Sequence, residues 1–408
     1  MLRFQRFSAR LVAIACAVLF AGILIYPRAA IGAALNGISI WWDVLFPALF
    51  PFLVISEVML GFGIVHFLGT LFDPVMRPLF RVPGIGGFVF AMGFAAGYPV
   101  GSKLTAQLMD QQLMLREEGE RLVAFTSTSD PIFLISAVSI GFFHDPALAV
   151  VLAAAHYGTA VLVGILMRFY KGRVQSPPPP RPEGPRVSIM KRAFQAMHAA
   201  RMKDGRDLGT LLQESIVSSL QLIMVIGGLV VFLSVILEML IQMGWMDAFV
   251  LLISGILESL GLPAALSEAV VNGLFEVTLG SKSAGSLAGA VGLQSSAAAA
   301  AFVLSWSGLS VHAQIVSIMS RAGLRYGPFL FARALHGLLA ALAVMLIWEE
   351  VYPAAAVWME PVRAFSGAAG TPAATAVLGS VSAGMAAAVT VLLLLLSPAA
   401  AAIRRLIE

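Results

Sequence analysis

Cysteine and charge are both scarce in this chain of 408 residues. Cys16 is the only cysteine, which excludes an internal disulfide and a cysteine-based metal site. The sequence contains no HExxH, no nucleophile elbow and no P-loop, because Gly101-Ser102-Lys103 lacks the required Gly-Lys-Ser/Thr order. We therefore do not expect an enzyme, and we expect neither a cofactor nor a metal.

Charged residues make up only 12% of the chain, against about 25% in soluble domains. The formal net charge is +4, and the basic residues gather at the ends of apolar segments and in one linker, 171–210. That distribution is typical of membrane topology and not of a nucleic-acid surface. We expect no nucleic-acid partner.

Apolar residues, by contrast, make up 59% of the chain. This share predicts an all-α polytopic protein embedded in the lipid bilayer, where a spanning helix needs about 20 apolar residues. Residues 64–83 and 245–262 also carry charged residues, so we expect them to lie along the membrane interface. The eight predicted spans are 11–27, 44–63, 120–143, 146–169, 215–243, 298–319, 328–348 and 374–397.

Two further segments are apolar but too short or too polar to cross. As a helix, residues 86–97 would cover about 17 Å, roughly half of the bilayer, before Gly97-Tyr98-Pro99 interrupts them. We predict a re-entrant hairpin at 86–115, and a second at 266–294 with Gly280-Ser281-Lys282 at its tip. Such backbone is tolerated only against protein or a water-filled cavity.

Several motifs occur twice in the same order with near-equal gaps, which indicates an internal duplication. The matching positions are Gly101-Ser102-Lys103 with Gly280-Ser281-Lys282, Ser127 and Ser129 with Ser305 and Ser307, and His156 with His336.

The basic clusters predict the orientation of the spans. If Arg3, Arg6 and Arg10 lie inside, every later cluster also falls inside, and both termini are cytoplasmic. The two hairpins then enter from opposite faces, as in transporters with inverted repeats and a solute site near the midplane. The predicted divisions are an N-terminal helix at 1–34, a first repeat at 35–170, a proline-rich, basic and partly disordered linker at 171–210, a second repeat at 211–350, and an extracytoplasmic loop with a last helix at 351–408.

Lys103 and Lys282 are the most unusual residues of this pattern. A buried lysine costs about 2.5–3.5 kcal/mol on insertion scales, so it usually faces a pathway or a partner. Two related lysines favour a small anionic solute as the ligand. The alternative is that each pairs with a carboxylate, such as Asp130 or Glu276, or reaches an interface.

Two polar stretches interrupt apolar segments after the hairpins. Asp130 before Pro131 predicts a helix N-cap that leaves 126–130 unwound. In the second half, Gly308 is expected to break the helix and Ser310 to cap its continuation. Such breaks present backbone N–H groups to a ligand, although their hydroxyls can also bond to their own helices. The predicted substrate-binding residues are Tyr98, Gly101, Ser102, Lys103, Thr126, Ser127, Thr128, Ser129, Gly280, Ser281, Lys282, Ser305, Trp306 and Ser307.

A coupling proton or sodium ion would need further polar groups, or the same groups could neutralise a lysine. The candidates are Asp130, Asn272, Glu276 and Thr278. Glu57, Glu238, His156 and His336 lie within predicted spans, where helix packing and proton coupling both remain open.

Several motifs resemble the sporulation integral membrane protein family called YlbJ or SpoVV. The resemblance is dense over about 35–170 and looser over 210–350. Its motifs are Trp41-Trp42, Phe46-Pro47-Ala48-Leu49-Phe50-Pro51-Phe52, Pro78-Leu79-Phe80-Arg81-Val82-Pro83-Gly84, the stretch from Gly97 to Ala106, Gly119-Glu120-Arg121-Leu122-Val123 and Gly141-Phe142-Phe143-His144-Asp145-Pro146.

The resemblance implies a member of the wider group with nucleoside-recognition gate domains, similar in plan to concentrative nucleoside transporters. It implies movement of dipicolinic acid from the mother cell across the outer forespore membrane. Together with the inverted repeats, we expect this transport to proceed by alternating access around a fixed midplane site. Homo-oligomers occur in the wider group. The alternatives are a carrier of nucleosides or other polar metabolites, a channel, and a non-transporting scaffold for spore assembly.

Overall fold

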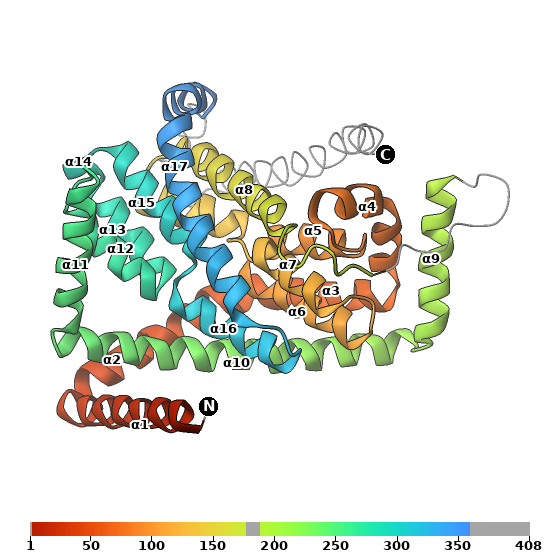
Figure 1. Ribbon diagram of the computed structural model, residues 1–408, viewed down its shortest axis with the longest axis horizontal. Coiled ribbons are helices and arrows are strands. Elements are labelled where there is room, and N and C mark those ends of the chain that lie inside the picture. The colour runs from red at the N-terminus through yellow and green to blue at the C-terminus, as the bar shows by residue number, and fades with distance from the viewer. Residues whose placement is uncertain (1, 177–187, 360–408) are drawn as a thin grey trace.

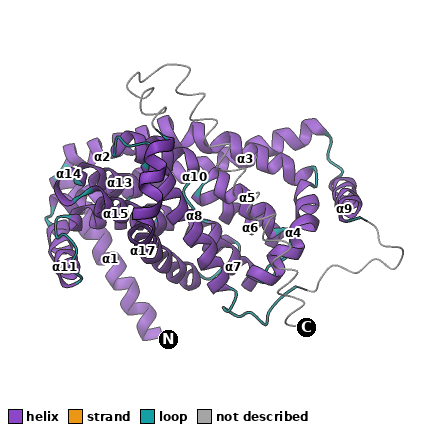
Figure 2. Ribbon diagram, turned by 90° about the horizontal axis from the view of Figure 1, so that it is seen from above, coloured by secondary structure: helices purple, strands orange, loops and turns teal. Residues whose placement is uncertain are grey.

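The computed structural model describes residues 2–176 and 188–359, which form helices and contain no strand (Figures 1 and 2). Four helices are long and apolar enough to cross a membrane, or up to six if two bent pairs each count as one span. The predicted all-α membrane class is therefore confirmed, whereas the number of eight spans is not. The predicted span 374–397 lies outside the described residues.

The N-terminal part contains two sharp bends. Helices α1 (Leu2–Ile25) and α2 (Pro27–Ser39) meet at 105°, with proline at the start of α2. The π-helix η1 (Ile40–Leu45) leads into α3 (Phe46–Gly61), and α3 meets α4 (Ile64–Phe80) at 84°. Gly63 makes this second turn with φ 76°, a left-handed value that favours glycine. The predicted spans 11–27 and 44–63 are therefore not straight membrane-spanning helices. Each belongs to a bent pair of helices, and only the pair as a whole is long and apolar enough to cross a membrane.

The rest of the first half is a helical hairpin, an interrupted helix and a long helix. The hairpin consists of α5 (Gly86–Ala96) and α6 (Tyr98–Asp110). The interrupted helix consists of α7 (Arg116–Thr126) and η2 (Phe133–Phe142), and α8 (Leu148–Met167) follows it.

The second half repeats this order of elements after α10 (Leu208–Gln242) and α11 (Trp245–Ser259). Its hairpin is α12 (Leu266–Phe275) and α13 (Val277–Ser286), followed by the short α14 (Ala288–Val291). Its interrupted helix is α15 (Leu293–Trp306) and α16 (Gly308–Arg321), and its long helix is α17 (Tyr326–Trp358). Both halves thus contain a hairpin, an interrupted helix and a long helix in the same order, which supports the internal duplication predicted from the repeated motifs.

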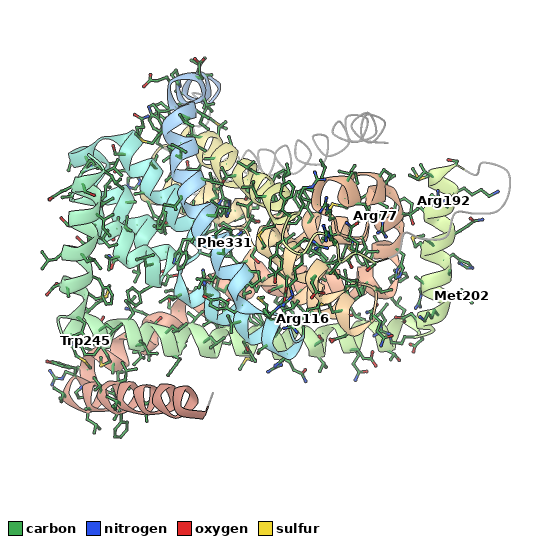
Figure 3. The ribbon with its side chains drawn as sticks, viewed as in Figure 1. Arg77, Arg116, Arg192, Met202, Trp245 and Phe331 are labelled. Carbon is green, nitrogen blue, oxygen red and sulfur yellow. The ribbon has the colours of Figure 1, made fainter. Side chains whose placement is uncertain are left out.

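The linker contains a helix, α9 (Ile189–Asp204), which packs against α4. Its Phe194 ring lies 5.0 Å from the ring of Phe67. Met202 on α9 and Trp245 at the start of α11 lie near opposite ends of α10, which runs along the base of the view (Figure 3). The linker is thus partly ordered, and residues 177–187 lie outside the described part.

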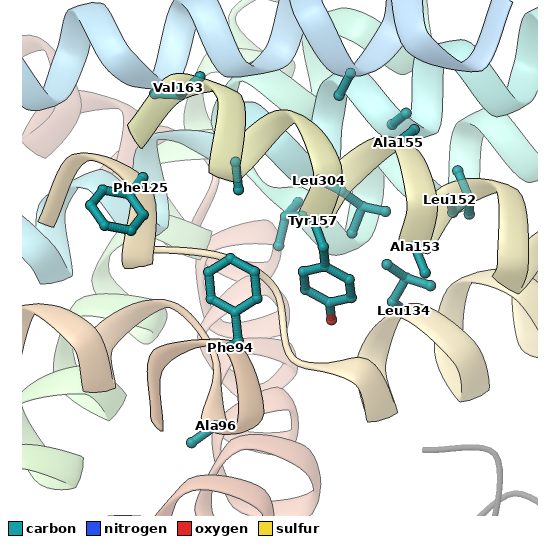
Figure 4. Packing of buried hydrophobic residues seen from close by; sticks show 14 of the residues in the cluster. Phe94, Ala96, Phe125, Leu134, Leu152, Ala153, Ala155, Tyr157, Val163 and Leu304 are labelled. Carbon is teal, nitrogen blue, oxygen red and sulfur yellow. The ribbon is translucent and has the colours of Figure 1, made fainter. Parts of the chain in front are cut away.

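The core lies where α8, α15 and α17 pack together between the two hairpins. Aromatic rings fill the part of the core in the first half, where Phe80 stacks on Phe125 at 4.6 Å. Phe94 lies 5.3 Å from Tyr157, and Figure 4 shows these two rings with Phe125 nearby. The buried face of α15 is built from alanine, so its neighbours α8 and α17 can approach closely. This packing holds the interrupted helices in fixed positions.

Candidate functional site

Each hairpin is interrupted at one residue. Gly97 separates α5 from α6 with φ 90° and ψ −175°, a conformation that is essentially restricted to glycine. Glu276 separates α12 from α13 in extended conformation, and its carboxylate accepts a hydrogen bond from the N–H of Leu279 at 2.7 Å. The prediction that Gly280-Ser281-Lys282 forms the second tip is wrong. Glu276 forms the tip because its carboxylate caps α13.

The interruption of the first long segment agrees with the prediction. Residues Ser127 to Asp130 are not helical, and the helix resumes at Pro131. The Asp130 carboxylate accepts a hydrogen bond from the N–H of Phe133 at 2.8 Å, as an N-cap does.

In the second half, Ser307 itself adopts the left-handed conformation, with φ 80°, and Gly308 follows with φ 73°. Ser310 lies within α16 and does not cap it, so that prediction is wrong. The left-handed residue makes the turn before Ser310 is reached.

Each hairpin tip lies against the interruption of its own half. A Cβ atom on Gly97 would lie 3.3 Å from Oδ2 of Asp130. A Cβ atom on Gly308 would lie 3.1 Å from the Cα of Glu276. All four interruptions are thus paired, two and two, so each hairpin tip lies beside the polar stretch of its own half.

Hydrogen bonds then join the two halves at these interruptions. The Tyr98 hydroxyl donates to the carbonyl of Leu304 at 2.8 Å. His156 on α8 contacts the Ser305 hydroxyl through Nδ1 at 2.7 Å, and His336 on α17 contacts the His156 carbonyl through Nε2 at 2.8 Å. The candidate site is this meeting point.

Arg333 of α17 occupies the centre of the meeting point and is fully buried. Its guanidinium donates to the carbonyls of Ala124 and Ser127 in the first half and of Ser305 in the second, while Nε has no partner within the ranges that the structure describes. Among residues 2–176 and 188–359, no carboxylate lies within 4 Å of it. Arginine remains protonated in proteins, so Arg333 carries a buried positive charge that has no ion-pair partner in the described part of the chain.

Two hydroxyls at the same interruptions have no hydrogen-bond partner among the described residues. The Thr128 hydroxyl is fully buried and has no hydrogen-bond partner in the described part of the chain. The Ser307 hydroxyl lies near that of Tyr98 but makes no hydrogen bond of good geometry there. Buried hydroxyls are normally satisfied, so these positions are suited to a polar ligand or to water.

Lys103 does not lie at this centre. Its ammonium forms an ion pair with Oε1 of Glu57 at 2.7 Å, and Gln107 and Ser218 donate to the same oxygen at 2.7 and 2.8 Å. The partner is therefore neither Asp130 nor Glu276, and Glu57 acts in contacts between α3, α6 and α10. Of the two interpretations left open for Glu57, helix packing and proton coupling, its contacts with α6 and α10 correspond to helix packing.

Lys282 lies within α13, with its side chain exposed on the surface of the protein and in no ion pair among the described residues. Nearby, the Asn272 amide donates to the Ser283 hydroxyl at 3.0 Å. The two lysines are thus in unlike surroundings, although their motifs match. Sequence similarity between the repeats does not extend to the role of this residue.

Several other residues predicted to bind substrate instead make hydrogen bonds to backbone carbonyls or allow close helix packing. Hydroxyls bond back to carbonyls of their own helix at Ser102, Thr126 and Ser127. The indole N–H of Trp306 donates to the carbonyl of Leu274 at 3.1 Å. Gly101 is a packing position, because a Cβ atom there would lie 2.8 Å from the Thr126 hydroxyl. Gly280 is also a packing position, since a Cβ atom there would lie 2.3 Å from the Cα of Gly273.

An ionic cluster joins the halves at a second place. The Glu120 carboxylate accepts hydrogen bonds from Nε and Nη2 of Arg325, each at 2.7 Å, and from the Tyr170 hydroxyl at 3.0 Å. Arg121 beside it is fully buried. It donates to the carbonyls of Arg81, Tyr170, Lys171 and Val174. This cluster holds the start of the linker and the start of α17 against α7.

The fold and the meeting point define an all-helical membrane protein with paired hairpins and paired helix interruptions. A family model described as "Gate: Nucleoside recognition" matches residues 43–161. The chain is 41% identical over 343 residues to the sporulation integral membrane protein YlbJ of Bacillus subtilis (strain 168), covering 84% of this chain and 83% of that protein. The chain belongs to the YlbJ family of sporulation integral membrane proteins. No solved structure matches it.

Sequence reasoning missed Arg333, although a signal was present. An arginine inside a predicted span, here 328–348, is expensive and usually marks a functional position. Arg333 is not part of the duplicated pattern, because the aligned region of the first half, around Ala153, has no basic residue.

Proposed function

We propose that this protein transports a small anionic metabolite, dipicolinate, from the mother cell across the outer forespore membrane. The observation that carries the proposal is the buried guanidinium of Arg333, which has no carboxylate partner among the described residues and is bound to the interruptions of both halves.

The buried charge of Arg333 is energetically costly. Moving an ion out of water costs several kcal/mol even after relaxation, unless a partner compensates. The carbonyls of Ala124, Ser127 and Ser305 solvate Arg333 but do not neutralise it. An anionic solute would supply the missing charge, and a planar guanidinium suits a carboxylate better than any other side chain does.

Dipicolinate fits the chemistry of these surroundings. It is a small aromatic dianion, so one carboxylate could bind Arg333 while the hydroxyls of Thr128 and Ser307 bind further oxygens. The aromatic rings of Tyr98 and His312 lie at the same interruptions and suit an aromatic ligand. The name of the relative, a sporulation integral membrane protein, supports the cellular setting.

The mechanism that we propose is alternating access around this fixed point. The two halves, as inverted repeats, would move against each other. The hairpin tips at Gly97 and Glu276, as re-entrant segments, would limit access to the site. Both termini would lie on the mother-cell side.

A second candidate is the transport of nucleosides, which the description of the matching family model favours. The two substrates differ in charge, because nucleosides are neutral and do not compensate Arg333.

The test is uptake of labelled dipicolinate into proteoliposomes by the wild type, Arg333→Gln and Arg321→Gln. Arg321 is an exposed arginine at the end of α16 and serves as the matched control. Loss of a charge-assisted hydrogen bond worth about 1.5–3 kcal/mol predicts a half-saturation constant about 10- to 150-fold higher for Arg333→Gln. Saturable uptake should be unchanged in Arg321→Gln.

Thermal unfolding in detergent establishes that each variant is folded. Equal uptake by all three proteins would remove Arg333 from the site. Uptake of labelled nucleosides but not of dipicolinate by the wild type would favour the second candidate.

A further inference from the structure

Two stacked imidazoles lie beside Arg333. His156 of α8 and His336 of α17 are both fully buried, with ring centroids 5.0 Å apart and planes inclined by 29°. They occupy matching positions in the two halves. Their hydrogen bonds are nevertheless different, and the difference gives them unequal chemistry.

Both ring nitrogens of His156 are occupied. The backbone N–H of Ser129 donates to Nε2 at 3.0 Å, so Nε2 is an acceptor and carries no proton. A neutral imidazole then has its proton on Nδ1, which donates to the Ser305 hydroxyl at 2.7 Å. His156 is thus fixed as one neutral tautomer that links both interrupted helices.

Only one ring nitrogen of His336 makes a hydrogen bond within the described residues. Its Nε2 faces the carbonyl of His156 at 2.8 Å, and a carbonyl only accepts, so Nε2 carries the proton. Its Nδ1 is then an unprotonated base, buried and without a hydrogen-bond partner in the described ranges. A free lone pair of this kind is unusual in a packed core.

The groups around His336 determine when this base can take up a proton. Its own helix contributes the positive charge of Arg333, and α8 contributes the neutral His156. Helix α15 contributes the carbonyl of Ser305. Two carbonyls that bind Arg333 come from Ala124 of α7 and from Ser127 in the interruption that follows it. The only fixed charge among these groups is positive, so it opposes a second positive charge on His336.

We propose that Nδ1 of His336 is the proton site that couples proton movement to anion movement. An anion bound to Arg333 cancels the opposing charge, and His336 can then take up a proton. Anion and proton would bind together and cross together. This inference rests on the proposed function, since it needs an anion at Arg333.

Linkage gives the expected size of the effect. If the anion favours proton uptake, the proton favours anion binding by the same factor. Coupling between two sites is typically about 5- to 150-fold in affinity. Dipicolinate should therefore bind more tightly to the protein at low pH than at high pH by a factor in this range.

The informative substitution is His336→Gln. The glutamine amide can place an N–H group where Nε2 lies, which keeps the hydrogen bond to the His156 carbonyl, but it has no titratable base. His198→Gln is the matched control, because His198 is exposed on α9 and far from the site.

Two measurements in proteoliposomes separate the outcomes. The first is exchange of labelled dipicolinate with equal concentrations on both sides, which needs binding and translocation but no coupling. The second is dipicolinate accumulation driven by an inward proton gradient, with a trapped pH-sensitive dye to report proton entry. We expect His336→Gln to retain exchange and to lose both accumulation and dipicolinate-dependent proton entry, whereas His198→Gln behaves as the wild type.

Accumulation and proton entry by His336→Gln equal to those of the wild type would overturn the inference and leave the proposed function intact. Absence of exchange by the wild type would overturn the proposed function, and this inference with it. If His336→Gln does not fold, calorimetry on the wild type decides, with dipicolinate titrated in two buffers of different ionisation enthalpy. Uptake of a proton from the buffer on binding supports the inference, and its absence overturns it.

Discussion

The ion pair of Lys103 and Glu57 allows a sharp test of whether a buried charge serves stability or the ligand. The two side chains are only 9% and 12% exposed, and their charged atoms lie 2.7 Å apart. Breaking a buried pair by removal of one partner costs about 3–5 kcal/mol, because the other charge is left uncompensated. Replacing both partners by neutral residues of similar volume is often close to neutral.

The structure ranks the single variants. In Lys103→Met, the Glu57 carboxylate keeps the donors Gln107 and Ser218, so we expect a loss near the lower limit, about 3 kcal/mol. In Glu57→Gln, the ammonium of Lys103 loses its only ion-pair partner among the described residues, and we expect a loss nearer 5 kcal/mol. The double variant should be more stable than either single variant.

The assay is thermal unfolding of the four proteins in one detergent, read as a double-mutant cycle. Glu214→Gln is the control, because its pair with Arg206 is exposed and should be worth at most about 1 kcal/mol. Additive losses in the double variant would refute the reasoning. So would loss of dipicolinate exchange in a double variant that is stably folded, since Lys103 would then act on the ligand.

Three further predictions concern the other features of the fold. Gly97→Ala should destabilise the protein by about 1–3 kcal/mol in thermal unfolding, because φ 90° with extended ψ strains any residue with a Cβ atom. Glu120→Gln should lower the unfolding temperature in the same assay, because Arg325 and the Tyr170 hydroxyl lose the charge of a carboxylate that is only 1% exposed, although Arg325 keeps its ion pair with Glu117. Hydrogen bonds from Arg206 hold the pKa of Asp204 below its ordinary value, so Asp204 stabilises the α9–α10 corner above about pH 4, and this contribution disappears as the pH falls through the lowered pKa. Wild type and Asp204→Asn should therefore differ in unfolding temperature at neutral pH and converge in acid.

Each of these predictions has its own control. Gly158→Ala on α8 should not destabilise the protein, since no atom of the described residues lies within 4 Å of the added methyl group. An unchanged melting temperature in Glu120→Gln would show that the cluster adds no stability. A difference between Asp204→Asn and wild type that is constant with pH would show that the charge of Asp204 is not the cause.

Local chemistry let the sequence predict most of the helix interruptions. Gly97 and the Asp130-Pro131 pair interrupt helices through the backbone preferences of the residues themselves, so no knowledge of neighbours was needed. The apolar composition likewise determined the all-helical membrane class, because a bilayer accepts few other folds. The position of the second interruption, at Glu276, required more than a matching Gly-Ser-Lys motif.

Only the tertiary structure decided which groups meet. Lys103 pairs with Glu57 and not with Asp130 or Glu276, because α3 and α10 pack beside α6 and place their polar side chains next to the Lys103 ammonium. Arg333 reached the centre of the site because α17 packs against α7 and α15, whose carbonyls come from distant parts of the chain. Sequence patterns report the preferences of each segment, whereas the compensation of a buried charge depends on the distance to groups on other segments.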